Sequence, residues 1–122
     1  MKKILVIDDD LEIVELVKNR LQANHYEVLT APDGIEGLEL AKVHQPDLIV
    51  LDVMMPHMDG YTFVQEIKLI DHLRRIPIMI ITAKADMQDL FVNEGVNCCL
   101  TKPFKTEVFL EKVQQLVHSI NP

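Results

Sequence analysis

The sequence predicts an α/β domain: a doubly wound, five-stranded parallel sheet with helices on both faces. Short apolar runs alternate with stretches of helical spacing, and this β, α pattern repeats five times. Strands separated by helices pair in parallel through right-handed crossovers, and near-continuous apolar runs indicate a sheet covered on both faces. The length of 122 residues fits one domain with one core, so we expect a single domain over 1–122 and no effector domain in this chain.

The first strand and helix lie at the start of the chain. The apolar run from Lys3 to Ile7 is typical of a buried strand. Asp10 is a candidate cap for the following helix, which ends at Asn24-His25. One face of that helix carries the apolar residues Ile13, Val14, Leu16, Val17 and Leu21.

The second and third strands differ in polarity. Tyr26 to Ala31 is weaker and more polar, so we expect it at an edge of the sheet. Pro32-Asp33-Gly34 turns the chain into a second helix. Asp47 to Leu51 is almost wholly apolar, which requires both of its faces to be covered. The apolar residues of the second helix are Ile35, Leu38, Leu40 and Ala41.

The third helix and fourth strand follow a loop through Pro56 and Gly60. Pro77 to Ile81 is the fourth strand, with Pro77 at its first residue, where a missing N–H is tolerated. The helix before this strand carries the apolar residues Phe63, Val64, Ile67 and Ile70.

The last part of the chain completes the pattern. A short helix is predicted around Asp86 to Glu94, with Gly95 as its stop, and Cys98 to Leu100 is a brief fifth strand. Thr106 is a candidate cap for the final helix. That helix carries Val108, Phe109, Val113, Leu116, Val117 and Ile120.

Composition and charge exclude several functions. The 19 acidic residues outnumber 12 Lys and Arg, giving a net charge of -7, so we expect no direct binding to nucleic acid or to a membrane surface. The longest apolar runs are far too short for a membrane span, which needs about 20 residues. Met1-Lys2-Lys3 resembles the start of a signal peptide, but the apolar stretch after it ends within a few residues at Asp8, so we expect no export. The adjacent Cys98 and Cys99 cannot form an unstrained bridge, so we expect a cytoplasmic protein with reduced thiols.

Polar residues stand where the predicted strands end. The carboxyl ends of parallel strands meet at one edge of the sheet, where ligands bind. Acids, a hydroxyl and an ammonium therefore converge there. The residues are Asp8 and Asp9 after the first strand, Asp52 after the third, Thr82 after the fourth and Lys102 after the fifth.

This set of side chains predicts a site for Mg²⁺ and a phosphoryl group. Carboxylates crowded at one edge repel each other by roughly 1 to 4 kcal/mol per pair at about 4 Å, and a divalent cation relieves that repulsion. All the candidate ligands are oxygens, which favours a hard ion, and Mg²⁺ leaves positions open for a phosphate. Lys102 supplies a positive charge and Thr82 a donor for phosphoryl oxygens. An Asp would be the nucleophile.

Four motifs in order resemble the response regulator receiver domains of two-component signalling, and the match spans the chain. The resemblance implies a flavodoxin-like receiver fold with strand order 2-1-3-4-5. The motifs are Ile4-Leu5-Val6-Ile7-Asp8-Asp9-Asp10, Leu51-Asp52-Val53-Met54-Met55-Pro56-His57-Met58-Asp59-Gly60, Ile81-Thr82-Ala83 and Thr101-Lys102-Pro103-Phe104.

The resemblance implies a phosphorylation-controlled switch centred on Asp52. Asp52 would accept a phosphoryl group from a sensor histidine kinase or a histidine phosphotransfer protein. Asp9 and Asp52 would ligate Mg²⁺ together with the backbone carbonyl of Met54, while Asp8 would act through a metal-bound water. The chain would catalyse only its own phosphotransfer and dephosphorylation, and it would act on a downstream effector. A homodimer through the fourth and fifth helices is left open.

The remaining implied roles surround the acceptor. Thr82 would move toward the phosphoryl oxygens, Ala83 would leave room for the incoming group, and Lys102 would pair with the phosphate. Pro103 would follow a cis peptide bond that turns Lys102 inward. Cys99 stands where the family commonly has an aromatic ring, which puts aromatic coupling in question.

Two alternatives stay open at this stage. The spacing of Asp8 and Asp10 suits a Mg²⁺-dependent phosphohydrolase, although that reading leaves Asp52 and Lys102 unexplained. The second alternative is an interaction module that switches without phosphorylation. If the chain is a receiver, we expect slow loss of the phosphoryl group, because Met54 and Lys84 beside the acceptor are poor bases for positioning water.

Overall fold

The computed structural model describes residues 1–52, 60–83 and 95–118. The strands form one parallel sheet in the order β2-β1-β3-β4-β5, which confirms the predicted topology and the edge position of β2. The helix expected around Asp86 to Glu94 lies outside the described residues. The strands are β1 (Lys3–Ile7), β2 (Glu27–Ala31), β3 (Leu48–Asp52), β4 (Ile78–Thr82) and β5 (Cys98–Thr101). The helices are α1 (Leu11–Ala23), α2 (Gly34–His44), α3 (Gly60–Lys68) and α5 (Thr106–His118).

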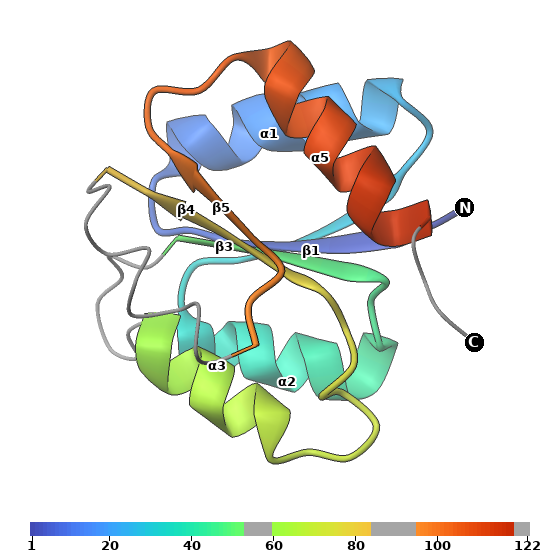
Figure 1. Cartoon of the computed structure of the whole chain (residues 1–122), viewed down its shortest axis with the longest axis vertical. Helices are drawn as coiled ribbons and strands as arrows, with labels where there is room; N and C mark the ends of the chain where they lie inside the picture. Colours follow the sequence, from blue (N-terminus) through green and yellow to red (C-terminus); the bar gives the residue numbers. More distant parts are fainter. Residues whose placement is uncertain (53–59, 84–94, 119–122) are drawn as a thin grey trace.

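Helices cover both faces of the sheet, as Figure 1 shows. On one face, apolar side chains of the strands pack beneath α1 and α5, and we call this set the α1/α5 cluster. On the other face, alternate residues of the same strands pack against α2 and α3 in the α2/α3 cluster. β3 and β4 are buried along their whole length, as expected for central strands covered on both sides. None of the helices described is long and apolar enough to cross a membrane.

Capping side chains fix where the first two helices begin. The Oδ1 atom of Asp10 accepts hydrogen bonds from the backbone N–H groups of Glu12 at 3.0 Å and Ile13 at 3.4 Å. The Oδ1 atom of Asp33 accepts one from the N–H of Glu36 at 2.9 Å. Each cap satisfies N–H groups that have no partner within their own helix. The predicted capping role of Asp10 is therefore confirmed.

Several element boundaries differ from the prediction by one residue. The fourth strand begins at Ile78 and not at Pro77, because proline has no N–H to donate to a neighbouring strand. Thr106 was expected to cap α5 but is its first residue. Lys105 is in the cap position, since its carbonyl accepts the N–H of Phe109 at 3.0 Å. β3 and β4 each extend one residue further, to Asp52 and Thr82. Both of these candidate site residues thus end a strand.

Three residues assigned to apolar helix faces are exposed. Leu16 is 50% exposed, Ile35 52% and Val108 40%. Leu16 precedes the buried Val17 by one residue, a rotation of about 100° around a helix, which turns it away from the sheet. Val108 has the same relation to the buried Phe109. The buried stripe of each helix is therefore narrower than its apolar composition suggests.

Candidate functional site

Three carboxylates gather at the carboxyl edge of the sheet. Carboxylate oxygens of Asp8, Asp9 and Asp52 lie within 4.8 Å of one another. Asp8 and Asp9 directly follow β1, and Asp52 ends β3, the strand that pairs with β1. Asp8 and Asp52 are buried, with 3% and 7% exposure, whereas Asp9 is exposed. The cluster therefore has two buried carboxylates and one that faces solvent.

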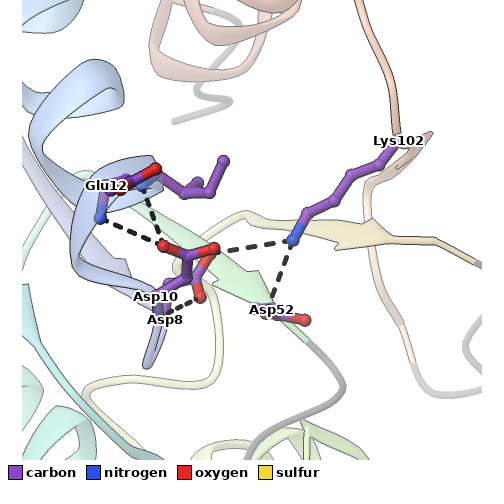
Figure 2. Close-up of polar contacts among 6 residues, drawn as sticks. Asp8, Asp10, Glu12, Asp52 and Lys102 are labelled. Atoms are coloured by element: carbon purple, nitrogen blue, oxygen red, sulfur yellow. Dashed lines mark hydrogen bonds and ion pairs between the residues drawn. The ribbon is translucent and has the colours of Figure 1, made fainter.

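Lys102 reaches into this cluster from β5, on the other side of β3. Its Nζ atom lies 3.5 Å from Oδ2 of Asp52 and 3.9 Å from Oδ2 of Asp8 (Figure 2). The backbone N–H of Lys102 donates to the carbonyl of Thr82 at 2.7 Å, which fixes the root of the side chain beside β4. One cation is thus shared by two buried carboxylates.

The alternation of strand residues explains why these side chains meet. Successive side chains of a strand point to opposite faces of the sheet, so residues two apart share a face. Each charged residue follows, two positions later, an apolar residue of the α1/α5 cluster, so all three leave the sheet on the same side. The pairs are Val6 and Asp8, Val50 and Asp52, and Leu100 and Lys102.

The electrostatics of Asp8 are dominated by its burial, which raises its pKa from 3.8 to about 7. The N–H of Asp10 opposes this effect by donating a hydrogen bond to Oδ1 of Asp8 at 3.0 Å. The charge of Asp52 and a hydrogen bond with its side chain raise the pKa further, while Lys102 lowers it. Burial, together with the neighbouring carboxylate, therefore favours retention of a proton at Asp8 where no metal ion balances the charge.

The other predicted residues surround this centre. Thr82 is fully buried at the end of β4, and Ala83 is exposed immediately after it. The peptide bond between Lys102 and Pro103 is cis, the isomer that the resemblance implies. Met54 and Lys84 lie outside the described residues.

The donor set fits Mg²⁺ in its chemistry. Asp8, Asp9 and Asp52 offer carboxylate oxygens, the ligand type that hard divalent cations prefer. When ionised, the three carry a charge of three minus against the single plus of Lys102, so a dication would bring the site close to neutrality. Because Asp9 is exposed, an ion bound there would be open to solvent, which suits Mg²⁺, an ion that retains several waters when bound.

Two features of the site were not predicted from the sequence: the contact between Lys102 and Asp8, and the raised pKa of Asp8. The contact could have been found from the alternation of side chains along a strand, which places Asp8 and Lys102 on the same face as the buried apolar residues two positions before them. Asp10, which the hydrolase alternative needs beside Asp8, is occupied as the cap of α1. Its Oδ1 points at backbone N–H groups, as Figure 2 shows.

Fold and site together define a doubly wound α/β domain with a cluster of carboxylates and a lysine at the carboxyl edge of its sheet. The sequence matches the family described as the response regulator receiver domain over residues 4–114, and the chain belongs to this family. It is a receiver domain of two-component signalling, a phosphorylation-controlled switch of the kind that interacts with histidine kinases and effectors.

Similar proteins support this assignment. The chain is 41% identical over 119 residues to the DNA-binding dual master transcriptional regulator RpaA of a Synechocystis species, covering 96% of this chain and 49% of RpaA. The chain spans about half the length of the first curated relatives it matches. Transcriptional control is therefore a property of those longer proteins.

Solved structures show the same fold. The chemotaxis response regulator CheY4 of Vibrio cholerae has a TM-score of 0.90 and 34% identity, with coverage of 95% of this chain and 98% of CheY4. The receiver domain of the sensor histidine kinase PA1611 of Pseudomonas aeruginosa PAO1 has a TM-score of 0.88 and 28% identity, with coverage of 95% and 97%. The PA1611 structure has a magnesium ion coordinated in its active site cleft.

Proposed function

We propose that Asp52 is the phosphoryl acceptor of this receiver domain. The donor is a histidine kinase or a histidine phosphotransfer protein, and the product is an aspartyl phosphate. The observation that carries the proposal is the 3.5 Å approach of the Lys102 ammonium to Asp52 inside a cluster of three carboxylates. This is the one place in the described structure where a nucleophilic carboxylate, a cation and a set of metal ligands are found together.

Asp52 suits the acceptor role better than its two neighbours. Asp8 accepts the N–H of Asp10 and has a raised pKa, which lowers its nucleophilicity below pH 7. Asp9 is exposed, where water competes with any phosphoryl donor. Asp52 is buried at the end of β3, a central strand, and contacts Lys102.

The transfer step balances in atoms and charge. A carboxylate oxygen of Asp52 attacks phosphorus, the bond from phosphorus to the histidine nitrogen of the donor breaks, and the imidazole leaves with that electron pair. Lys102 offsets negative charge on the phosphoryl oxygens, and the hydroxyl of Thr82 donates to one of them. Exposed Ala83 adds no side chain beyond a methyl group at the entry to the site.

Mg²⁺ is the proposed cofactor, and it supplies charge neutralisation for the phosphoryl group. Asp9 and Asp52 would bind it directly with the backbone carbonyl of Met54, and Asp8 through a water. The cluster of carboxylate oxygens supports this set, as does the magnesium ion in the structure of the PA1611 receiver domain. Pro103 would keep Lys102 directed inward.

Phosphorylation would act by shifting an equilibrium between an inactive and an active conformation. Moving such an equilibrium from 1:99 to 99:1 takes about 5.5 kcal/mol of differential stabilisation. New contacts of the phosphate with Thr82, Lys102 and the metal ion are the proposed source. The domain thus signals to an effector and does not turn over a separate substrate. A cytoplasmic location, a single domain over 1–122 and a homodimer through the fourth and fifth helices remain predictions.

Intact-mass analysis after incubation with acetyl phosphate and Mg²⁺ tests the acceptor. The wild-type chain should gain one phosphoryl group, and Asp52→Asn should gain none. Asp71→Asn is the matched control, because Asp71 is an exposed surface carboxylate paired only with Arg74 in the described contacts. This control should be labelled like the wild type. Labelling of Asp52→Asn at the wild-type rate would place the acceptor elsewhere.

A further inference from the structure

The segment between Lys102 and α5 is anchored by two aromatic rings. The ring centroids of Phe104 and Phe109 lie 5.5 Å apart, with 31° between the ring planes. Phe109 is 1% exposed in the α1/α5 cluster, and Phe104 is half-buried against the same cluster. The two phenylalanines therefore join the chain that leaves β5 to the first turn of α5.

This contact has the form of a hydrophobic staple. In a staple, the residue before the helix cap packs against the fourth residue of the helix and fixes the direction in which the chain enters. Lys105 is in the cap position, because its carbonyl accepts the N–H of Phe109. Phe104 directly precedes this cap, and Phe109 is the fourth residue of the helix, which begins at Thr106.

We propose that Phe104 is a positioning residue, which directs the Lys102 side chain onto Asp52 through its contact with Phe109. The inference rests on the proposed function of Asp52 and Lys102. The backbone of Lys102 is held at the sheet by its N–H bond to the carbonyl of Thr82 at 2.7 Å. The staple holds the chain two residues further on, so Lys102 is fixed from both sides.

The geometry of Lys102 makes such support necessary. Its ammonium stands at the end of a four-carbon chain, 3.5 Å from Asp52 and 3.9 Å from Asp8, so a small rotation at its backbone moves the charge away from both carboxylates. A displacement of about 1 Å in a catalytic group can cost about 100-fold in rate. Cys99 lies on the opposite face of β5 and packs into the α2/α3 cluster. It has no aromatic ring that could support Lys102 from that side.

The test compares the rate of labelling by acetyl phosphate with the affinity for Mg²⁺ alone. Phe104→Ala should label at least about tenfold more slowly than the wild type, by the sensitivity to displacement given above. Its Mg²⁺ affinity should equal or exceed that of the wild type, because the carboxylate ligands lie at the ends of β1 and β3, outside the segment that the staple holds, and a displaced Lys102 competes less with the ion. Phe104→Leu, which restores an apolar contact, should recover most of the rate.

Val117→Ala is the matched control for a purely structural effect. Val117 is fully buried in the α1/α5 cluster near the far end of α5, so its truncation weakens the same core without touching the staple. It should label at the wild-type rate under conditions where it is folded. If Phe104→Ala does not fold, Phe104→Val takes its place; its apolar side chain is shorter than that of leucine, so it should label more slowly than Phe104→Leu.

The proposed function and the positioning role fail on different outcomes. Absence of label on the wild-type chain would overturn the proposed function, whatever the variants do. A labelled wild type with an equally fast Phe104→Ala would overturn the positioning role alone. Equal slowing in Val117→Ala, or a parallel loss of Mg²⁺ affinity in Phe104→Ala, would also overturn it, because both indicate a general loss of structure.

Discussion

Replacing Asp8 with asparagine should remove a pH dependence of stability that comes from this residue's burial. Without metal, the folded chain retains a proton on Asp8 up to its pKa of about 7, whereas the unfolded chain releases it near 3.8. The native state therefore binds more protons between these values, so the free energy of unfolding falls as pH rises through this range. The full effect is about 4 kcal/mol, at 1.36 kcal/mol for each tenfold change in proton affinity.

Urea denaturation in EDTA from pH 5 to pH 8 measures this effect. The stability of Asp8→Asn relative to the wild type should rise by about 3 kcal/mol across this range, because the neutral amide carries no buried charge. The amide oxygen of asparagine can still accept the N–H of Asp10, and every other residue is the same in the two chains, so the comparison isolates Asp8. Parallel stability curves for the two proteins would refute the reasoning, because Asp8 would then be ionised in the folded state at pH 5.

Three further substitutions test individual contacts. Gly37→Ala should destabilise the fold by about 1–3 kcal/mol in urea, since a Cβ there would meet Cδ1 of Ile7 and lie 2.9 Å from its Cγ1; a gain in stability would contradict this packing. Asp10→Ala should cost about 1 kcal/mol as a lost cap with labelling by acetyl phosphate unchanged, and a lost label would instead place Asp10 in the site. Lys102→Ala should slow labelling yet strengthen Mg²⁺ binding in calorimetry, because it removes a competing cation; weaker binding would count against the shared site.

Much of the architecture could be predicted because short apolar runs alternate along the chain with stretches of 3.6-residue periodicity. The same regularity places Asp52 and Thr82 at the ends of their strands. Helix faces were less predictable, since Leu16 and Val108 are apolar and adjacent to the buried stripe but turn away from the sheet. One-dimensional periodicity does not distinguish the centre of a stripe from its border.

The electrostatics of the site depend on distances that no sequence pattern contains. The raised pKa of Asp8 needs burial and the nearness of Asp52, which comes from a different strand. The contact of Phe104 with Phe109 does have a local signal, two apolar residues flanking a helix start. That signal becomes specific once α5 is known to begin at Thr106.

A crystal structure of the chain at saturating Mg²⁺ tests the central claim most directly. We predict one octahedral ion with oxygens of Asp9 and Asp52 at about 2.0–2.1 Å, and the Lys102 ammonium beside the same carboxylate. An ion bound only elsewhere, or an empty carboxylate cluster under these conditions, would contradict the assignment of this edge of the sheet as the phosphoryl-transfer site.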